Sequence, residues 1–209
     1  MLRTYLSLKI FNFKEFLFVL LWFPSFLWTE CLFCIAYFCI NPYRQSVKNQ
    51  PENIYGETPL STLKTLIEAL DFSPRTILDL GSGRGRGVFF LSHLLGCKVI
   101  GIEKVSCFVK IAKGLKKFHP HRDIEFYHQD MLKNLLPNVD VVYFYGTCLE
   151  DKKIQVLIEL FKQIPTPFKV LSVSYPLSDY SEDFETEKEI PARYPWGETT
   201  VYVNRLLLV

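Results

Sequence analysis

The chain has 209 residues, of which 49% are hydrophobic and 22% are charged, and its formal net charge is +2 at pH 7. This size and composition suit one globular domain. A net charge close to zero argues against a nucleic-acid-binding protein that works through bulk electrostatics, so no nucleic-acid partner is expected.

Residues 16–40 are the most hydrophobic stretch, and Glu30 is the only charged residue within it. The stretch exceeds the roughly 20 apolar residues that cross a bilayer as a helix. Pro24 and Glu30 lie near its middle, and a central acid costs on the order of a few kcal/mol on insertion. Two interpretations remain open. One is a single kinked span, and the other is two short pieces, 16–28 and 31–40, that lie shallowly or dip in and out.

We favour membrane attachment over a buried core helix, because so few polar residues leave this stretch without a side suited to water. A cleaved signal peptide fits less well, since no small-residue cleavage site follows the apolar run. Lysines and arginines lie on both sides, so the charges do not set an orientation. We therefore expect a membrane-anchoring segment at 1–42, a polar linker at 43–53 and one domain at 54–209.

The six cysteines lie in apolar contexts, which indicates reduced and packed thiols. Cys31 and Cys34 form a C-x-x-C pair, but neither a second such pair nor a pair of histidines completes a zinc set. No metal site is predicted.

The domain is expected to begin with a helix that has Thr58 as its N-cap and Pro59 in its first turn. The apolar spacing predicts further helices at 87–95, at 105–115 and at about 150–164. Strands are predicted at 76–80, 98–103, 124–128, 139–146 and 169–175, with a long final strand from residue 199.

Strands that alternate with helices predict an α/β fold, with a mostly parallel sheet covered by helices on both faces. In such a sheet the ligand crevice lies at the carboxyl ends of the strands. The acidic stretch 181–189 is expected to be a solvated loop, although it is also a candidate for attracting a basic substrate.

The most informative motif follows the first predicted strand, where Asp79, Gly81, Gly83 and Gly85 alternate with other residues. A dinucleotide fingerprint needs a different glycine spacing, and a phosphate-binding P-loop needs a Gly-Lys-Ser/Thr ending that is absent here. The pattern matches the nucleotide loop of the Rossmann-like methyltransferases that use S-adenosylmethionine. This cofactor carries a sulfonium cation and no phosphate, so a carboxylate beside bare backbone suits it. A plain strand-to-helix turn rarely needs three alternating glycines beside an acid.

Two further acids end the next strands. Glu103 lies about 20 residues past the loop, where a residue that accepts hydrogen bonds from a ribose diol is expected. Asp130 ends the third strand, where it could contact the adenine amino group; a role as the N-cap of a helix over "MLKNLL" is nearly as well supported.

Residues 54–130 resemble class I methyltransferases. The segments "IYGETPLSTLKTLIEAL", "ILDLGSGRGRGVFF" and "VIGIEK" are similar to the non-SET histone lysine methyltransferases of the telomeric-silencing type. The hydrophobic leader before a minimal domain also resembles the membrane-anchored lysine methyltransferases of mitochondria. This resemblance implies a Rossmann-like fold with a seven-stranded sheet, preceded here by a hydrophobic N-terminal helix.

The resemblance also implies a cofactor site for S-adenosyl-L-methionine. Asp79 and the glycines would surround the methionine part, Glu103 would hold the ribose, and the segment from Tyr55 to Glu57 would close over the cofactor. The full set of implied cofactor residues is Tyr55, Glu57, Asp79, Gly81, Ser82, Gly83, Gly85, Glu103, Lys104, Gln129, Asp130 and Tyr145.

The sequence departs from the histone enzymes at Arg84 and Arg86, and it has "YFYGTC" at 143–148 in place of their asparagine-rich strand end. Tyr145 and Thr147, beyond the fourth strand, are the candidates for the acceptor site, and Glu57 is a third candidate catalytic residue. Tyr143 is expected to be a core residue.

We expect a protein lysine as the acceptor. A lipid, quinone or other small apolar acceptor is the alternative, and an inactive protein that keeps the fold for binding is a third. The domain is expected to be membrane-associated and to face the cytoplasm or another compartment that contains the cofactor.

Overall fold

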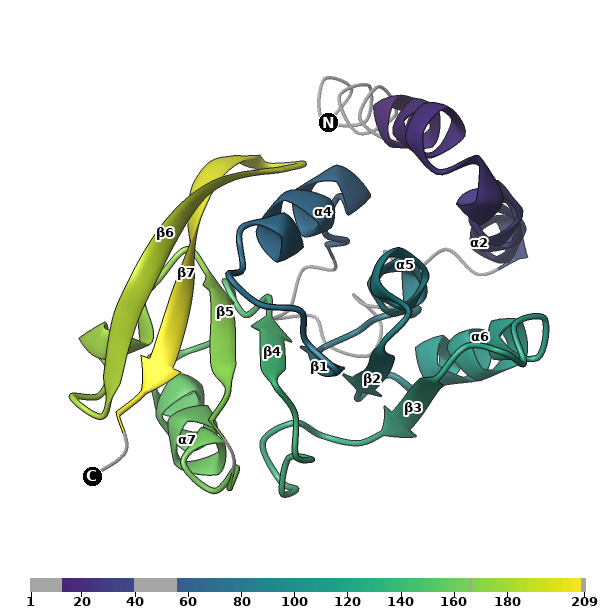
Figure 1. Ribbon diagram of the computed structural model, residues 1–209. Coiled ribbons are helices and arrows are strands. Elements are labelled where there is room, and N and C mark those ends of the chain that lie inside the picture. Colours follow the sequence, from purple (N-terminus) through teal and green to yellow (C-terminus); the bar gives the residue numbers. More distant parts are fainter. Residues whose placement is uncertain (1–12, 40–55, 166, 208–209) are drawn as a thin grey trace.

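The computed structural model describes residues 13–39, 56–165 and 167–207, and of residues 37–39 it describes the backbone alone (Figure 1). These residues form one seven-stranded sheet with helices on both faces. The predicted linker at 43–53 and Tyr55 lie outside the described residues.

The sheet has the strand order β3-β2-β1-β4-β5-β7-β6. The first five strands along the chain pair in parallel, whereas β7 is antiparallel to both β5 and β6. The sheet is therefore mixed. The expectation of a mostly parallel sheet is wrong, because the two longest strands, β6 and β7, pair in antiparallel orientation. The strands are β1 (Thr76–Leu80), β2 (Lys98–Glu103), β3 (Ile124–His128), β4 (Val141–Phe144), β5 (Lys169–Val173), β6 (Phe184–Tyr194) and β7 (Gly197–Leu206).

The last two strands form a long hairpin that closes through Pro195 and Trp196. So short a connection permits only antiparallel pairing. The acidic stretch 181–189, expected as a loop, is therefore largely the edge strand β6. Its charges suit an edge, since Glu185 pairs with Arg205 and Glu187 pairs with Lys169.

Helices cover the sheet as the alternating pattern predicted, with α4, α5 and α6 on one face and α7 on the other (Figure 1). The expected N-cap is wrong, because the hydroxyl group of Thr58 bonds to Tyr143 and α4 starts at Leu60. The helices are α4 (Leu60–Glu68), α5 (Arg86–Leu95), α6 (Ser106–Lys116) and α7 (Asp151–Phe161).

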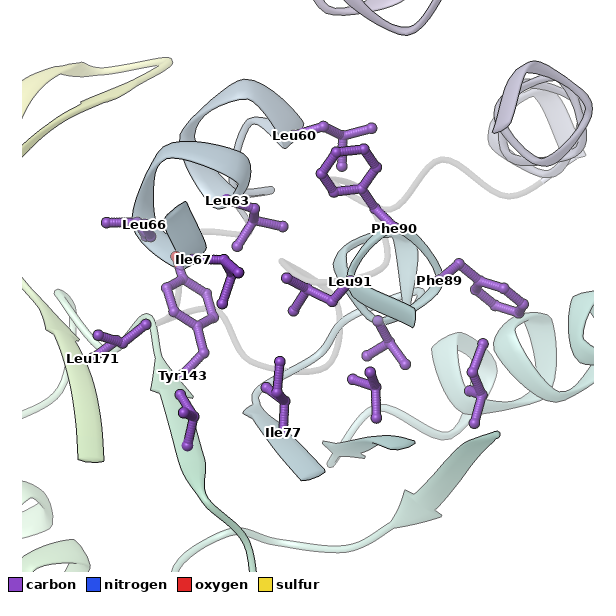
Figure 2. Close-up of a cluster of buried hydrophobic side chains, with 14 of the residues drawn as sticks. Leu60, Leu63, Leu66, Ile67, Ile77, Phe89, Phe90, Leu91, Tyr143 and Leu171 are labelled. Carbon is purple, nitrogen blue, oxygen red and sulfur yellow. The ribbon is translucent and has the colours of Figure 1, made fainter. Parts of the chain in front are cut away.

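The larger hydrophobic core lies between the sheet and the helices α4 and α5. In Figure 2, Ile77, Tyr143 and Leu171 point from the strands toward Ile67 of α4 and Leu91 of α5. A second core under α7 is built around Phe144 and other side chains of the opposite face. The sheet is thus sandwiched between two apolar layers, which fixes the positions of its strand ends.

The hydrophobic leader forms a bent pair of helices rather than a single one. The helix Phe13–Trp22 is followed by a short turn, Pro24–Phe26, and by α2 (Leu27–Cys39), and the bend is 116°. Pro24 begins the second helical piece, where its missing N–H costs nothing. No described helix is by itself long and apolar enough to cross a membrane, although the bent pair together meets that requirement by length and composition.

One face of the bent pair packs on the domain. Val19, Phe26 and Phe33 are fully buried in the larger core, and Phe26 meets Phe90 edge to face with ring centroids 5.4 Å apart. The sequence favoured membrane attachment over a buried core helix for residues 16–40. The side that carries Val19, Phe26 and Phe33 is nevertheless buried against the domain.

Candidate functional site

The loop between β1 and α5 lies at the point where the strand order reverses, between β1 and β4. Parallel sheets bind ligands at such a point. Gly81, Gly83 and Gly85 all have positive φ, at 85°, 55° and 84°. At Gly85 a side chain is also excluded by space, since a Cβ atom would lie 2.6 Å from the ring of Phe126. The backbone path of this loop therefore requires glycine.

Asp79 precedes the loop on β1, between Gly101 of β2 and Tyr143 of β4. Asp79 is 7% exposed, and none of the described residues donates a hydrogen bond to its side chain. Burial, with the nearby charge of Glu103, raises the pKa of Asp79 to about 7. A buried carboxylate without a donor is costly, so this position favours a cationic partner supplied by a ligand.

Glu103 ends β2 and reaches across to the glycine loop. Its carboxylate accepts hydrogen bonds from the backbone N–H of Gly83 at 2.9 Å and of Val105 at 2.7 Å. Burial raises the pKa of Glu103, although these N–H groups act in the opposite direction. Asp79 and Glu103 thus flank the loop, as the sequence predicted.

Ser82 adds another unsatisfied group in this loop. Its hydroxyl oxygen is buried and has no hydrogen-bond partner among the described residues, although most buried side-chain polar atoms have one. Together, the hydroxyl of Ser82 and the carboxylate of Asp79 fit a ligand that carries both polar groups and a positive charge.

The two arginines of the loop are both largely buried and bind acids outside it. Arg84 binds Glu57 through Nε at 2.9 Å and through Nη2 at 2.5 Å, and it also donates to the carbonyl oxygen of Phe33. Arg86 forms a two-pronged pair with Glu30, with Nη2 to Oε1 at 2.6 Å and Nε to Oε2 at 3.0 Å. Arg84 and Arg86, the two positions at which the sequence departs from the histone enzymes, therefore connect the loop to the segment before α4 and to the leader.

An aromatic group lies beyond the carboxyl ends of β4 and β5. Trp196 donates from its indole Nε1 to the hydroxyl of Tyr145 at 2.5 Å and stacks on Tyr194, with ring centroids 5.5 Å apart. Gly56 lies against Tyr145, where an added Cβ would be 3.2 Å from the hydroxyl oxygen. The segment that was expected to close over the cofactor thus contacts this aromatic group.

Sequence reasoning identified Tyr145 but missed Tyr194 and Trp196. The available signal was "YPWGE", a pair of aromatic residues beside a Pro and a Gly, which is typical of a hairpin tip. The hairpin carries them to the site because Val201 of β7 pairs with Val173 at the end of β5. Tyr143 is buried, as predicted, and its hydroxyl bonds to Thr58 and Tyr194.

The other candidates lie around this centre. Asp130 accepts from the backbone of Leu132 and pairs with Lys104 at 3.3 Å, so here it caps its own turn. The backbone N–H of Gln129 donates to the backbone carbonyl oxygen of Glu103 at 3.1 Å. Thr147 is exposed, one residue beyond Gly146.

A cavity of about 560 Å³ lies elsewhere, at the amino ends of β4 and β5, where Asp140 and Lys169 line it. We place the functional site at the glycine loop because the unpaired buried polar groups and the strand-order reversal are there.

The family model described as histone methylation protein DOT1 matches residues 39–190. Phosphoethanolamine N-methyltransferase 3 of Arabidopsis thaliana is 30% identical over 146 residues, which are 64% of this chain and 29% of that protein. The histone-lysine N-methyltransferase specific for H3 lysine 79 of Dictyostelium discoideum is 24% identical over 131 residues, 56% of this chain and 7% of that protein. The chain therefore spans less than a third of the length of either relative.

Among solved structures, an RNA methyltransferase of Salinibacter ruber in complex with S-adenosyl-L-homocysteine has a TM-score of 0.58 at 25% identity. The match covers 72% of this chain and 93% of that one. TrmN of Thermus thermophilus has a TM-score of 0.61 at 14% identity, over 79% of this chain and 52% of that one. The second likeness shows the shared fold alone.

Proposed function

The chain belongs to the family of DOT1 histone methylation proteins, and on this basis we propose that it is an S-adenosylmethionine-dependent methyltransferase whose acceptor is a lysine side chain of a protein. The observation that carries the proposal is the buried carboxylate of Asp79, which has no donor among the described residues and lies beside a loop of positive-φ glycines.

The residues of the site fit S-adenosylmethionine by their chemistry. Asp79 would hold the positively charged methionine part, the bare backbone from Gly81 to Gly85 would lie against it, and Glu103 would accept hydrogen bonds from the ribose. The cofactor supplies a methyl group on a sulfonium, which is already a good leaving group. The protein's contribution is therefore mainly to position the acceptor in line with the methyl group and to exclude water.

The acceptor nitrogen must present its lone pair, so an ammonium must lose a proton before transfer. Burial against an apolar aromatic surface removes a lysine from water and so lowers its pKa. The ring faces would also hold the sulfonium of the cofactor or the methylated ammonium product. Tyr145, Tyr194 and Trp196 provide such a surface next to the site. Burial raises the pKa of Tyr145, so its hydroxyl stays neutral and serves to position the acceptor rather than to remove the proton.

The names of both curated relatives support a nitrogen acceptor, because each denotes an N-methyltransferase. The roles of Tyr145, Thr147 and Glu57 in catalysis stay predictions. Glu57 is already paired with Arg84, so its contribution would be to hold the segment before α4 closed.

A small amine or lipid headgroup is the second candidate acceptor. The likeness to a phosphoethanolamine N-methyltransferase, at 30% identity, favours it specifically. Quinones and other small apolar acceptors lack comparable support.

The test has two parts, on the full chain purified in detergent. Calorimetry should show S-adenosylmethionine binding that Asp79→Asn weakens at least a hundredfold, whereas Asp71→Asn, at an exposed position, leaves it unchanged. Undiminished binding by Asp79→Asn would contradict the cofactor site.

In the second part, labelled cofactor is incubated with membranes and cell extract, and the label is followed into protein, lipid and soluble fractions. Methyl-lysine in hydrolysed protein is the expected product. Label in lipid or small amines would favour the second candidate. Cofactor binding without any transfer would overturn the enzyme proposal and favour a binding protein.

A further inference from the structure

The leader exposes several large apolar side chains to solvent. Six of the thirteen large hydrophobic side chains that are exposed among the described residues belong to 13–36, although this segment is short. We call these exposed side chains together the outer face, and they are Phe13, Leu20, Leu21, Trp22, Trp28 and Ile35. Large apolar side chains that are exposed close together in one segment are typical of an interaction site.

The acids of this segment are turned away from the outer face. Glu15 and Glu30 are both buried: Glu15 accepts from the backbone N–H of Leu60 at 2.5 Å and from the hydroxyl of Ser61, and Glu30 pairs with Arg86. Lys14 is therefore the only exposed charged residue of 13–36. The sequence before it carries Arg3 and Lys9 and no acid.

We propose that the outer face docks the protein on a lipid surface in an interfacial mode, with the bent helix pair lying in the headgroup region rather than spanning the bilayer. The inference goes beyond methyl transfer and is independent of it. The bend of 116° sets the two helices across each other, and Val19, Phe26 and Phe33 hold their inner face in the core. A straight span would remove these side chains from the core and would carry Glu30 into the hydrocarbon region.

A lipid surface fits this face better than a protein partner does. Tryptophan is enriched at the membrane interface, where its ring is apolar and its N–H remains near water, and Trp22 and Trp28 are 70% and 60% exposed. Arg3, Lys9 and Lys14 carry positive charge and no exposed acid accompanies them, so this part of the sequence is complementary to an anionic lipid leaflet. An interfacial helix of this type binds through its apolar face, assisted by such cations.

The docked leader would also be rigidly connected to the site. Glu30 joins α2 to Arg86 at the start of α5, directly after the glycine loop, and Phe33 accepts from Arg84. Figure 1 shows α2 lying outside α5, away from the sheet. Docking would therefore hold the domain in a fixed orientation on the membrane.

The test measures binding of the full chain to vesicles of phosphatidylcholine with and without phosphatidylglycerol. We expect sedimentation with both kinds of vesicle, stronger with phosphatidylglycerol. The double change Leu21→Glu/Trp28→Glu should weaken partitioning roughly tenfold or more. Leu135→Glu is the matched control, because Leu135 is as exposed as Leu21, at 71%, and lies on the loop after β3.

Depth is measured by quenching of tryptophan fluorescence with lipids brominated near the headgroups or near the chain ends. The proposal expects stronger quenching by the shallow bromines, and a Trp22→Phe/Trp28→Phe variant should lose it. Equal vesicle binding by the glutamate variant and the wild type would overturn the proposal, as would stronger quenching by the deep bromines. A change from dimer to monomer without any vesicle binding would assign the face to a second copy instead.

Discussion

The carboxyl group of Asp79 links the proposed site to the stability of the protein. Its pKa is about 7 in the folded chain because of burial, followed by the charge of Glu103, whereas an exposed aspartate titrates near pH 4. The folded state thus retains a proton that the unfolded state releases. Retention of this proton contributes to the free energy of unfolding. The contribution is fully present below about pH 4 and is lost as the pH rises through about 7, by an amount on the order of 4 kcal/mol.

We therefore expect Asp79→Asn to raise the free energy of unfolding of the ligand-free protein at pH 8 and to leave it nearly unchanged at pH 4. Urea unfolding of wild type and variant at both pH values measures this. Asp183→Asn is a suitable control of opposite sign, since that side chain is 44% exposed and the hydrogen bond that Lys162 donates lowers its pKa. A variant whose stability parallels that of the wild type at both pH values would show that the carboxyl group is not desolvated.

At the scale of elements, the pair Glu30–Arg86 joins α2 to α5. Both side chains are largely buried, at 11% exposed for Arg86 and 7% for Glu30, and breaking such a pair from one side leaves an uncompensated charge. We expect Glu30→Gln to lower the free energy of unfolding by about 3 kcal/mol. Glu30→Gln/Arg86→Gln should recover part of this loss, because the double change leaves no charge behind.

The matched control is Glu68→Gln on α4, which removes an exposed pair with Lys64 and should cost less than about 1 kcal/mol. Thermal and denaturant unfolding in detergent give both values. If Glu30→Gln is no more harmful than Glu68→Gln, the leader does not hold α5.

At the scale of the whole molecule, the leader belongs to the domain that it precedes. Phe26 packs against Phe90, and Glu15 caps α4. We expect deletion of residues 1–39 to uncover this part of the core and to give an aggregated or poorly folded protein, rather than merely to release a soluble domain.

Size-exclusion chromatography and thermal unfolding test the deletion. The control is Leu21→Glu/Trp28→Glu, which changes the outer face of the same segment and should retain a cooperative transition. A deleted chain that unfolds cooperatively at the wild-type temperature would show that the leader is only an attachment.

Much of the fold could be predicted from local patterns. The helix after Thr58, the strand at 76–80 and the glycine loop were all readable, because apolar periodicity and glycine spacing are set by neighbouring residues. Asp79 and Glu103 follow from the same logic, since strand ends in a parallel sheet meet at one edge. The edge strand β6 was missed because an exposed, charged strand has the composition of a loop.

The sequence by itself determined the α/β architecture, the glycine loop with its two acids and the hydrophobic leader, because these depend on residues close together in the chain. Only the tertiary structure decided that Trp196 meets Tyr145, that Arg86 is paired with Glu30, and that the leader buries one face while exposing the other. Those outcomes depend on pairs about 50 or more residues apart, which local patterns do not specify and which packing around a common core brings together.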